Sequence, residues 1–184
     1  TNLGILWIIP QVLELPRDRL PSVDFLNSRI TPRTGWTIER TSVRYTDAVP
    51  WYNKFAKRIF LITDYMRSWE EIDWTPEPDM WHDIFGHLPF MVLKPYAELE
   101  EMFAPAFLAA AHDEQRENIK RLAWFSTEFG LIRQQGGLKL FGAGVGGAGP
   151  SQTLGKLGAV NALPGSFTVA LAAALTVTWM TRLK

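Results

Sequence analysis

Apolar residues at helical spacing dominate the second half of the chain, and short runs of β-forming residues occur in the first half. Apolar side chains recur every three or four positions in residues 96–111 and 118–131, as in a helix that buries one face. Residues 34–43 and 58–63 are rich in β-branched and aromatic residues and predict two short strands. Three acidic residues near the start of the predicted helix over residues 96–111 suit the helix dipole: Glu98, Glu100 and Glu101. The pattern predicts a mainly α fold with short β-strands.

Proline and small polar residues predict where the elements begin and end. Ser22 has the side chain of a helix N-cap and predicts a short helix that ends before Pro32. Residues 51–57 are expected to be helical, and residues 138–141 to form a strand that runs into a glycine-rich loop. Pro105 lies inside the longest predicted helix and should kink or interrupt it.

Two of the three histidines of the chain, His82 and His87, lie five residues apart. On a straight α-helix this offset is a rotation of about 140°, because each residue turns about 100°, so the two imidazoles do not easily meet one ion. Gly86, and Pro89 shortly after, predict the end of a helix over residues 78–85. Unwinding at Gly86 would bring His87 back toward the face of His82, as a metal site requires.

Glu128 is a candidate third ligand, because it is surrounded by apolar and aromatic residues. An ionised carboxylate in such a setting is costly unless a cation accompanies it. Two histidines and a carboxylate form the set that leaves open positions on non-haem Fe(II), and the same number of ligands suits catalytic zinc. The zinc-protease pattern H-E-x-x-H is absent, so residue types modestly favour iron. Taken singly, each histidine also fits a capping or core position, and Glu128 an exposed helix face.

The composition limits the class of protein. With 184 residues the chain is expected to form one domain with a sizeable core. Its 19 basic and 19 acidic residues give no charged surface for nucleic acid or an anionic membrane. The absence of cysteine excludes disulfides and thiolate ligands and is compatible with a cytoplasmic protein. The chain starts at Thr1 rather than Met, which suggests a fragment or a processed product, and residues 3–12 lack the features of a signal peptide.

The composition changes sharply near residue 150, where the chain becomes rich in Ala, Gly, Leu and Thr. The largely apolar, uncharged run 167–180 has 14 residues, fewer than the roughly 20 that span a bilayer, so a membrane span is not expected. The last part of the chain therefore differs in character from the rest.

Four short motifs, in this order and separation, carry a resemblance to a known family: residues 75–79 (TPEPD), 82–89 (HDIFGHLP), 124–131 (WFSTEFGL) and 141–144 (FGAG). Together they resemble the pterin-dependent aromatic amino acid hydroxylases, most closely the compact bacterial phenylalanine hydroxylases. The resemblance covers roughly residues 13–146. It implies a hydroxylase-like catalytic domain over residues 1–146, followed by a divergent apolar tail over residues 147–184.

The resemblance implies that His82, His87 and Glu128 hold Fe(II). It implies that a tetrahydropterin and O2 react at this iron and that the ring of an aromatic amino acid is hydroxylated, with phenylalanine to tyrosine favoured. The protein would fix the open face of the metal and hold the substrate ring near it. A non-catalytic remnant that binds iron or an amino acid is the alternative, and a zinc hydrolase ranks third.

The resemblance also assigns residues to the substrate and the pterin. Arg67 matches the arginine that binds the substrate carboxylate, a role that its two-pronged guanidinium suits. Trp51 lies near the aromatic residue that stacks on the pterin, and Asp83 matches an acidic position near it. Four further residues match the lining of the amino acid pocket: Thr75, Pro78, Trp124 and Phe129. Core packing or solvent exposure would also explain each of these residues.

The sequence departs from the family pattern at several positions. Ala123 replaces a tyrosine close to the iron, and Gly147 and Ala148 stand in place of a serine pair, one member of which helps to hold the substrate. No resemblance continues after about Val145, so the portion that completes the pocket wall is truncated or altered. A different tail, a truncation or a shifted reading frame would each produce this pattern. Metal binding can then survive while hydroxylation is weakened or lost.

Overall fold

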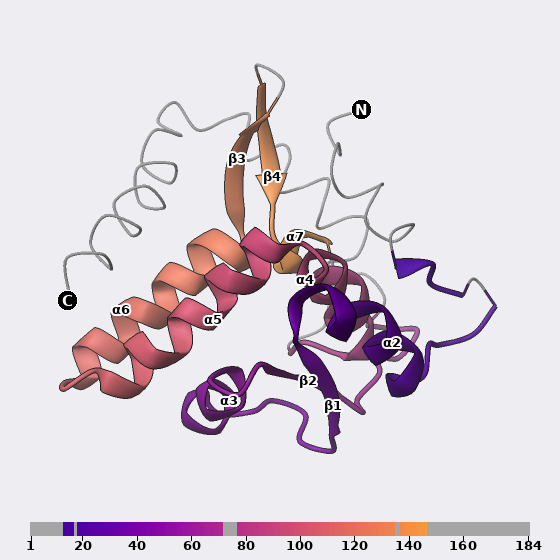
Figure 1. Ribbon diagram of the computed structural model, residues 1–184, viewed down its shortest axis with the longest axis horizontal. Helices are drawn as coiled ribbons and strands as arrows, with labels where there is room; N and C mark the ends of the chain where they lie inside the picture. Colours follow the sequence, from indigo (N-terminus) through magenta and orange to yellow (C-terminus); the bar gives the residue numbers. More distant parts are fainter. Residues whose placement is uncertain (1–12, 17, 72–76, 135–136, 147–184) are drawn as a thin grey trace.

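The computed structural model of the chain describes residues 13–16, 18–71, 77–134 and 137–146 (Figure 1). This part is mainly helical with two small two-stranded sheets, which confirms the predicted fold class. The elements are α2 (Val23–Thr34), β1 (Thr37–Thr41), α3 (Ala48–Phe55), β2 (Ile59–Thr63), η1 (His82–His87), α4 (Leu88–Met91), α5 (Lys94–Ala109), α6 (Asp113–Ala123), η2 (Trp124–Glu128), β3 (Gly130–Gln134), β4 (Gly137–Phe141) and α7 (Ala143–Gly146). The tail 147–184 lies outside the described residues, so the boundary at residue 146 stays a prediction. None of the described helices is long and apolar enough to cross a membrane.

Helix α2 begins as predicted but ends later. The Ser22 hydroxyl accepts a hydrogen bond from the backbone N–H three residues on, at 3.2 Å. The helix then continues past Pro32, so the predicted end was wrong. It stops at Gly35, whose φ of 76° lets its N–H bond to the carbonyl of Thr31. Proline removes one helical hydrogen bond, whereas the left-handed glycine turns the chain away from the helix axis.

The first half of the chain forms a β–α–β unit around an aromatic core. Strands β1 and β2 are parallel, with Thr37 opposite Ile59 and Thr41 opposite Thr63, and α3 connects them. Both predicted strands are confirmed, with shorter bounds. Buried aromatic rings fill the space between this sheet and the helices: Trp36, Tyr52, Phe55, Phe60 and Phe107. Their burial gives the unit the apolar core that stabilises it.

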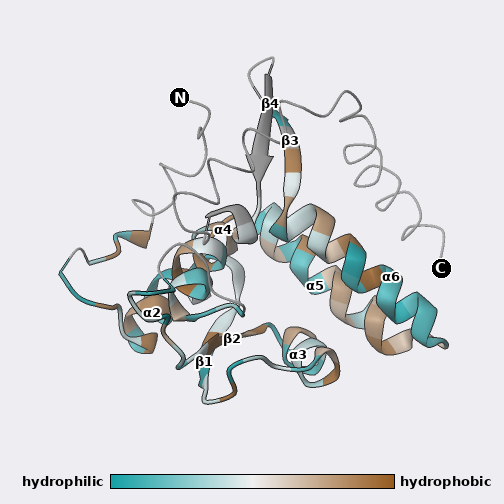
Figure 2. Cartoon of the chain, turned by 180° about the vertical axis from the view of Figure 1, so that it is seen from behind, coloured by the Kyte–Doolittle hydropathy of each residue, from teal (hydrophilic) through white to brown (hydrophobic). Residues whose placement is uncertain are grey.

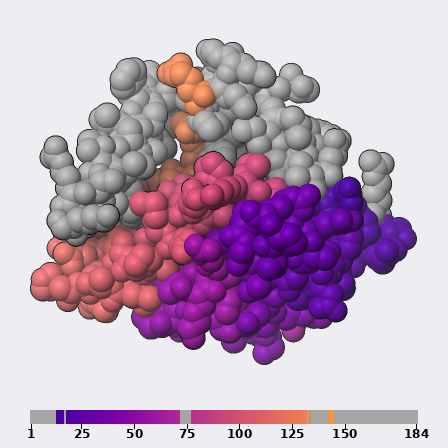
Figure 3. Space-filling model, viewed as in Figure 1, coloured from indigo at the N-terminus to yellow at the C-terminus, as the bar shows by residue number. Residues whose placement is uncertain are grey.

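Helices α5 and α6 form a pair beside this unit (Figure 1). The ring of Tyr52 on α3 stacks on Phe107 of α5, with centroids 4.4 Å apart, and so joins the two parts. Helix α6 is largely hydrophilic (Figure 2). The N-terminal half and the α5–α6 pair form one continuous surface (Figure 3). Pro105 was predicted to kink or interrupt its helix. It lies inside α5 without interrupting it.

The predicted helix over residues 118–131 was wrong at both ends. Helix α6 already begins at Asp113, and residues 130–134 form β3, which pairs antiparallel with β4. Strand β4 confirms the predicted strand over residues 138–141. The glycine-rich segment after it contains the short helix α7 instead of only a loop. This helix packs against both η1 and η2, the two segments that carry the candidate metal ligands.

Candidate metal centre

The two histidines lie on a single turn of π-helix. The backbone N–H of Leu88 bonds to the carbonyl of Asp83, five residues earlier, which is the π-helical pattern. The wider turn brings residues five apart onto one face, and the Nε2 atoms of His82 and His87 are 3.1 Å apart. The predicted unwinding at Gly86 was wrong, because the helix continues directly into α4.

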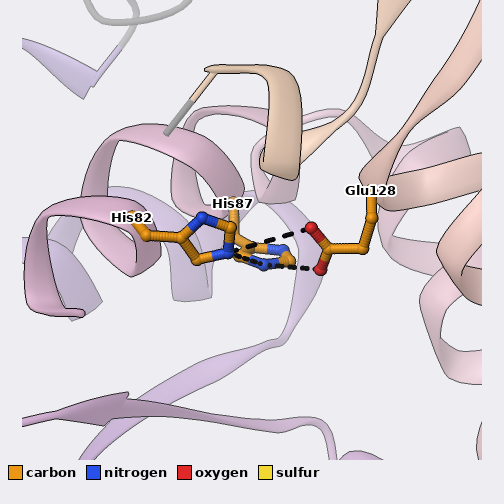
Figure 4. A group of neighbouring side chains, drawn as sticks. All are labelled: His82, His87 and Glu128. Atoms are coloured by element: carbon orange, nitrogen blue, oxygen red, sulfur yellow. Dashed lines mark hydrogen bonds and ion pairs between the residues drawn. The ribbon is translucent and has the colours of Figure 1, made fainter. Parts of the chain in front are cut away.

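A second π-turn carries the carboxylate. In η2 the N–H of Phe129 bonds to the carbonyl of Trp124 at 2.9 Å, again five residues back. Glu128 is the last residue of this turn. Its Oε1 lies 3.0 Å from Nε2 of His87 and its Oε2 lies 3.8 Å from Nε2 of His82 (Figure 4). One ligand atom from each residue lies within 4.8 Å of the others, so the structure brings all three predicted metal ligands together.

The charges of these three side chains depend on one another. Burial lowers the pKa of His87, but the adjacent Glu128 carboxylate outweighs this and raises it to about 9. Burial and the neighbouring His87 lower the pKa of His82 to about 4. Burial raises the pKa of Glu128, but the two imidazoles bring it down to about 2. The carboxylate is therefore ionised beside one protonated imidazole, and a divalent cation could replace that proton as its positive partner.

Helix α7 holds the two π-turns against each other. A Cβ on Gly86 of η1 would lie 2.7 Å from the carbonyl oxygen of Ala143. Gly142 has a φ of 122° and packs against the backbone carbonyl of Glu128. The N–H of Gly144 hydrogen-bonds the Glu128 carboxylate and helps to lower its pKa. Glycine is required at positions 86 and 142 because the backbones approach too closely there for a side chain.

Comparison with known proteins agrees with this architecture. A family model described as biopterin-dependent aromatic amino acid hydroxylase matches residues 5–150. The chain belongs to this family. It is 35% identical over 133 residues to the phenylalanine-4-hydroxylase of Ralstonia nicotianae, covering 72% of the chain and 42% of that protein. It is 32% identical over 133 residues to the Chromobacterium violaceum phenylalanine-4-hydroxylase, covering 72% and 44%. The chain thus spans less than half the length of these two hydroxylases.

Solved hydroxylase structures share the fold of the described residues. The phenylalanine hydroxylase of Legionella pneumophila superimposes with a TM-score of 0.75 at 28% identity, covering 82% of this chain and 64% of that one. The C. violaceum phenylalanine hydroxylase with bound iron(III) and 7,8-dihydrobiopterin gives a TM-score of 0.73 at 29% identity, covering 78% and 52%. These matches confirm the predicted family, and the described elements are those of a hydroxylase catalytic domain.

Arg67 of this hydroxylase domain is held by a buried carboxylate next to the histidines. Its Nε and Nη2 atoms donate to the two oxygens of Asp79, each at 2.8 Å. The exposed fractions of the two side chains are 5% and 0%. Asp79 also accepts the backbone N–H of His82 at 2.9 Å and so fixes the start of η1. The structure therefore links Arg67 to the metal centre through one residue, and its predicted role at the substrate carboxylate stays a prediction.

Three of the four residues predicted to line the amino acid pocket belong to the described part of the chain. Pro78 directly precedes Asp79. The rings of Trp124 and Phe129 are 4.8 Å apart at the two ends of η2, and Trp124 is 52% exposed. Thr75 lies outside the described residues. Phe129 directly follows the carboxylate ligand in sequence, and Trp124 begins the π-turn that carries it.

The two predicted pterin residues lie in different surroundings. Trp51 packs on Phe55 and Phe60, with ring centroids 4.8 and 5.3 Å away, so core packing already accounts for its side chain. Asp83 is buried beside the metal centre, and its Oδ2 accepts the N–H of Thr63 at 2.9 Å. Burial raises the Asp83 pKa to about 7. Contact with a pterin stays a prediction for both residues.

One carboxylate near the centre was missed by the sequence interpretation. Glu100 of α5 is 5% exposed, and burial raises its pKa to about 7, while the charge of His87 opposes that shift. We expected Glu100 only to complement the helix dipole. The available signal was its spacing, because Tyr96, Phe103 and Phe107 form the buried face of α5 on which Glu100 also lies.

Proposed function

We propose that this chain carries the iron-binding part of a hydroxylase that uses tetrahydropterin and O2 to hydroxylate the ring of an aromatic amino acid, converting phenylalanine to tyrosine. The observation that carries the proposal is the convergence of His82, His87 and Glu128 on two π-turns. Family membership is the second support. The relatives named phenylalanine-4-hydroxylase supply the reaction and the preferred substrate.

The donor set fits iron. Two imidazoles and one carboxylate leave the remaining coordination positions open, the arrangement that non-haem Fe(II) uses for oxygen chemistry. The partly buried, ionised Glu128 supplies negative charge where a divalent cation would lie. The same ligands can accept zinc, but the C. violaceum phenylalanine hydroxylase has been solved with bound Fe(III). This favours iron over the zinc-hydrolase alternative.

The side chains of the chain would bind and orient the reactants. The bound Fe(II) would supply the O2 chemistry, with the tetrahydropterin as the source of electrons. Arg67, oriented by Asp79, would bind the substrate carboxylate through its guanidinium. Trp124 and Phe129, with Pro78 and Thr75, would hold the substrate ring. Asp83 and Trp51 would lie on the pterin side, as the family resemblance implies.

A turnover assay tests this function. The iron-loaded chain is incubated with a tetrahydropterin, O2 and, in separate reactions, phenylalanine, tryptophan or tyrosine. We expect tyrosine from phenylalanine, and none above background from the His82→Ala variant. Formation of no tyrosine above the His82→Ala level would contradict the proposed activity. Elemental analysis of protein purified without added metal distinguishes iron from zinc.

A second candidate function is a non-catalytic protein that binds iron or an aromatic amino acid. The observation that favours it is Ala123 at the end of α6, in place of the family tyrosine close to the iron. Tight iron binding and thermal stabilisation by phenylalanine, without turnover, would support this alternative. Clear turnover would exclude it.

A further inference from the structure

Glu100 is a buried acidic residue that the proposed reaction does not use. Its exposed fraction is 5%, and it lies on the apolar face of α5. Two buried hydroxyl side chains act on its pKa, that of Tyr96 one turn earlier on α5 and that of Thr127 in η2. Thr127 is 2% exposed and directly precedes the ligand Glu128. A carboxyl group at a core position is costly unless polar groups compensate it, so this cluster calls for an explanation.

The second ring nitrogen of His87 explains why a carboxyl group is buried here. Its Nε2 faces Glu128 and His82. Its Nδ1 is buried and has no hydrogen-bond partner within the described ranges, and the same holds for Oε1 of Glu100. The charges of His87 and Glu100 act on each other. A metal-bound histidine almost always donates its second ring N–H to a carboxylate, a carbonyl or a water, which fixes the ring orientation and makes the ligand more basic.

Asp83 is a third carboxylate, besides Glu128 and Glu100, whose charge acts on His87. Its Oδ2 is already used by the N–H of Thr63, and it belongs to the same π-turn as His87. Glu100 instead reaches the centre from a different helix and is adjacent to Thr127 of the second π-turn. It is therefore the residue that can tie both ligand-bearing turns to α5.

We propose that Glu100 is a positioning residue of the metal centre: together with Tyr96 and Thr127 it orients His87 through Nδ1, directly or through one water, and supports the turn that carries Glu128. The proposal rests on the proposed function insofar as it requires a metal at His82, His87 and Glu128. It assigns Glu100 no contact with substrate or pterin.

Metal affinity is the first measurement. The metal-free chain is titrated with Co(II) and followed by absorption. We expect Glu100→Leu to weaken binding about 10- to 100-fold, the usual effect of removing a residue that supports a metal ligand. Glu100→Gln should recover most of this loss, because its amide oxygen still accepts a hydrogen bond. The matched control is Glu98→Gln on the exposed face of α5, which should bind Co(II) like the parent.

The second measurement reports on the His87 ring itself. The chain contains only three histidines, so ¹⁵N-histidine labelling of the Zn(II)-loaded protein gives a simple imidazole spectrum. The His87 Nδ1–H resonance should shift in Glu100→Leu and Glu100→Gln and stay unchanged in Glu98→Gln. A purely structural role of Glu100 would change the stability without moving this resonance selectively.

Two results would overturn the proposal. Parent-like Co(II) affinity in a folded Glu100→Leu variant would do so, and so would an unchanged His87 resonance in Glu100→Gln. The second result decides the matter even where Glu100→Leu does not fold. If the parent chain itself binds no metal, the proposed function fails together with this inference. If the parent binds metal tightly and the Glu100 variants match it, only the inference about Glu100 fails.

Discussion

The carbonyl oxygen of Ala143 lies so close to Gly86 that a Cβ on Gly86 would be 2.7 Å from it. This contact joins α7 to the middle of the π-turn that carries both histidines. A glycine that looked like a helix end in the sequence is therefore a packing position inside a continuous helix. This contact predicts whether replacing Gly86 by alanine raises or lowers the stability of the protein.

Gly86→Ala should destabilise the protein and weaken its metal binding. Within a helix, replacing glycine by alanine ordinarily stabilises by up to about 1 kcal/mol. Here the added methyl group would push α7 away, and overpacking of this kind costs roughly 1–3 kcal/mol. The free energy of unfolding from urea titration, with and without Co(II), measures the effect. A more stable Gly86→Ala variant would show that the close approach to Ala143 is unimportant.

The buried pair of Arg67 and Asp79 should be among the most sensitive positions of the chain. In Asp79→Ala the Arg67 charge would remain buried without its carboxylate, and breaking such a pair costs roughly 3–5 kcal/mol. The matched control is Asp64→Ala, which breaks the exposed ion pair with Arg40 and should cost at most about 1 kcal/mol. Urea unfolding of both variants gives the comparison. Equal losses in the two variants would contradict the structural role of Asp79.

Metal affinity should rise with pH between about 6.5 and 9. Glu128 raises the pKa of His87 to about 9, so below that pH a metal must displace a proton from this imidazole. Protonation therefore competes with the metal, and one displaced proton changes the apparent affinity about tenfold per pH unit. Co(II) titrations at several pH values in weakly buffered solution measure both the affinity and the released proton. An affinity that is constant across this range would show that His87 is not protonated in the metal-free chain.

The ligand residues could be predicted from the sequence, but their geometry could not. The spacing of His82 and His87 suggested a broken helix because periodicity arguments assume α-helical geometry. Gly86 in the π-turn packs against Ala143, which is distant in sequence, and local patterns do not register this contact. Strand β3 was missed for a related reason. Residues 130–131 continue an apolar helical pattern, and only pairing with β4 makes them a strand.

Glu100 illustrates the same limit for side chains. One acidic residue within an apolar face does not change the helical pattern of α5, so the helix was predicted although the burial of its carboxyl group was not. Two of the groups that act on the buried carboxyl group, Thr127 and His87, come from other elements. The family resemblance did not point to it either, because the motifs lie in residues 75–89 and 124–144.

The contact between Gly144 and Phe129 predicts a rescue experiment. A Cβ on Gly144 would overlap the Phe129 ring, with two ring carbons at 2.7 Å, and would disturb the N–H that bonds Glu128. We expect Gly144→Ala to reduce the Co(II) affinity and to destabilise the protein by roughly 1–3 kcal/mol. Adding Phe129→Leu gives the methyl group room, so the double variant should bind Co(II) more tightly than Gly144→Ala alone. The Phe129→Leu single variant is the control, because it removes the ring without adding the methyl group. The contradicting result is a loss of Co(II) affinity in the double variant that equals the sum of the losses in the two single variants. In that case the Phe129 ring does not transmit the effect of the added methyl group, and direct displacement of the Gly144 N–H would account for the weaker binding.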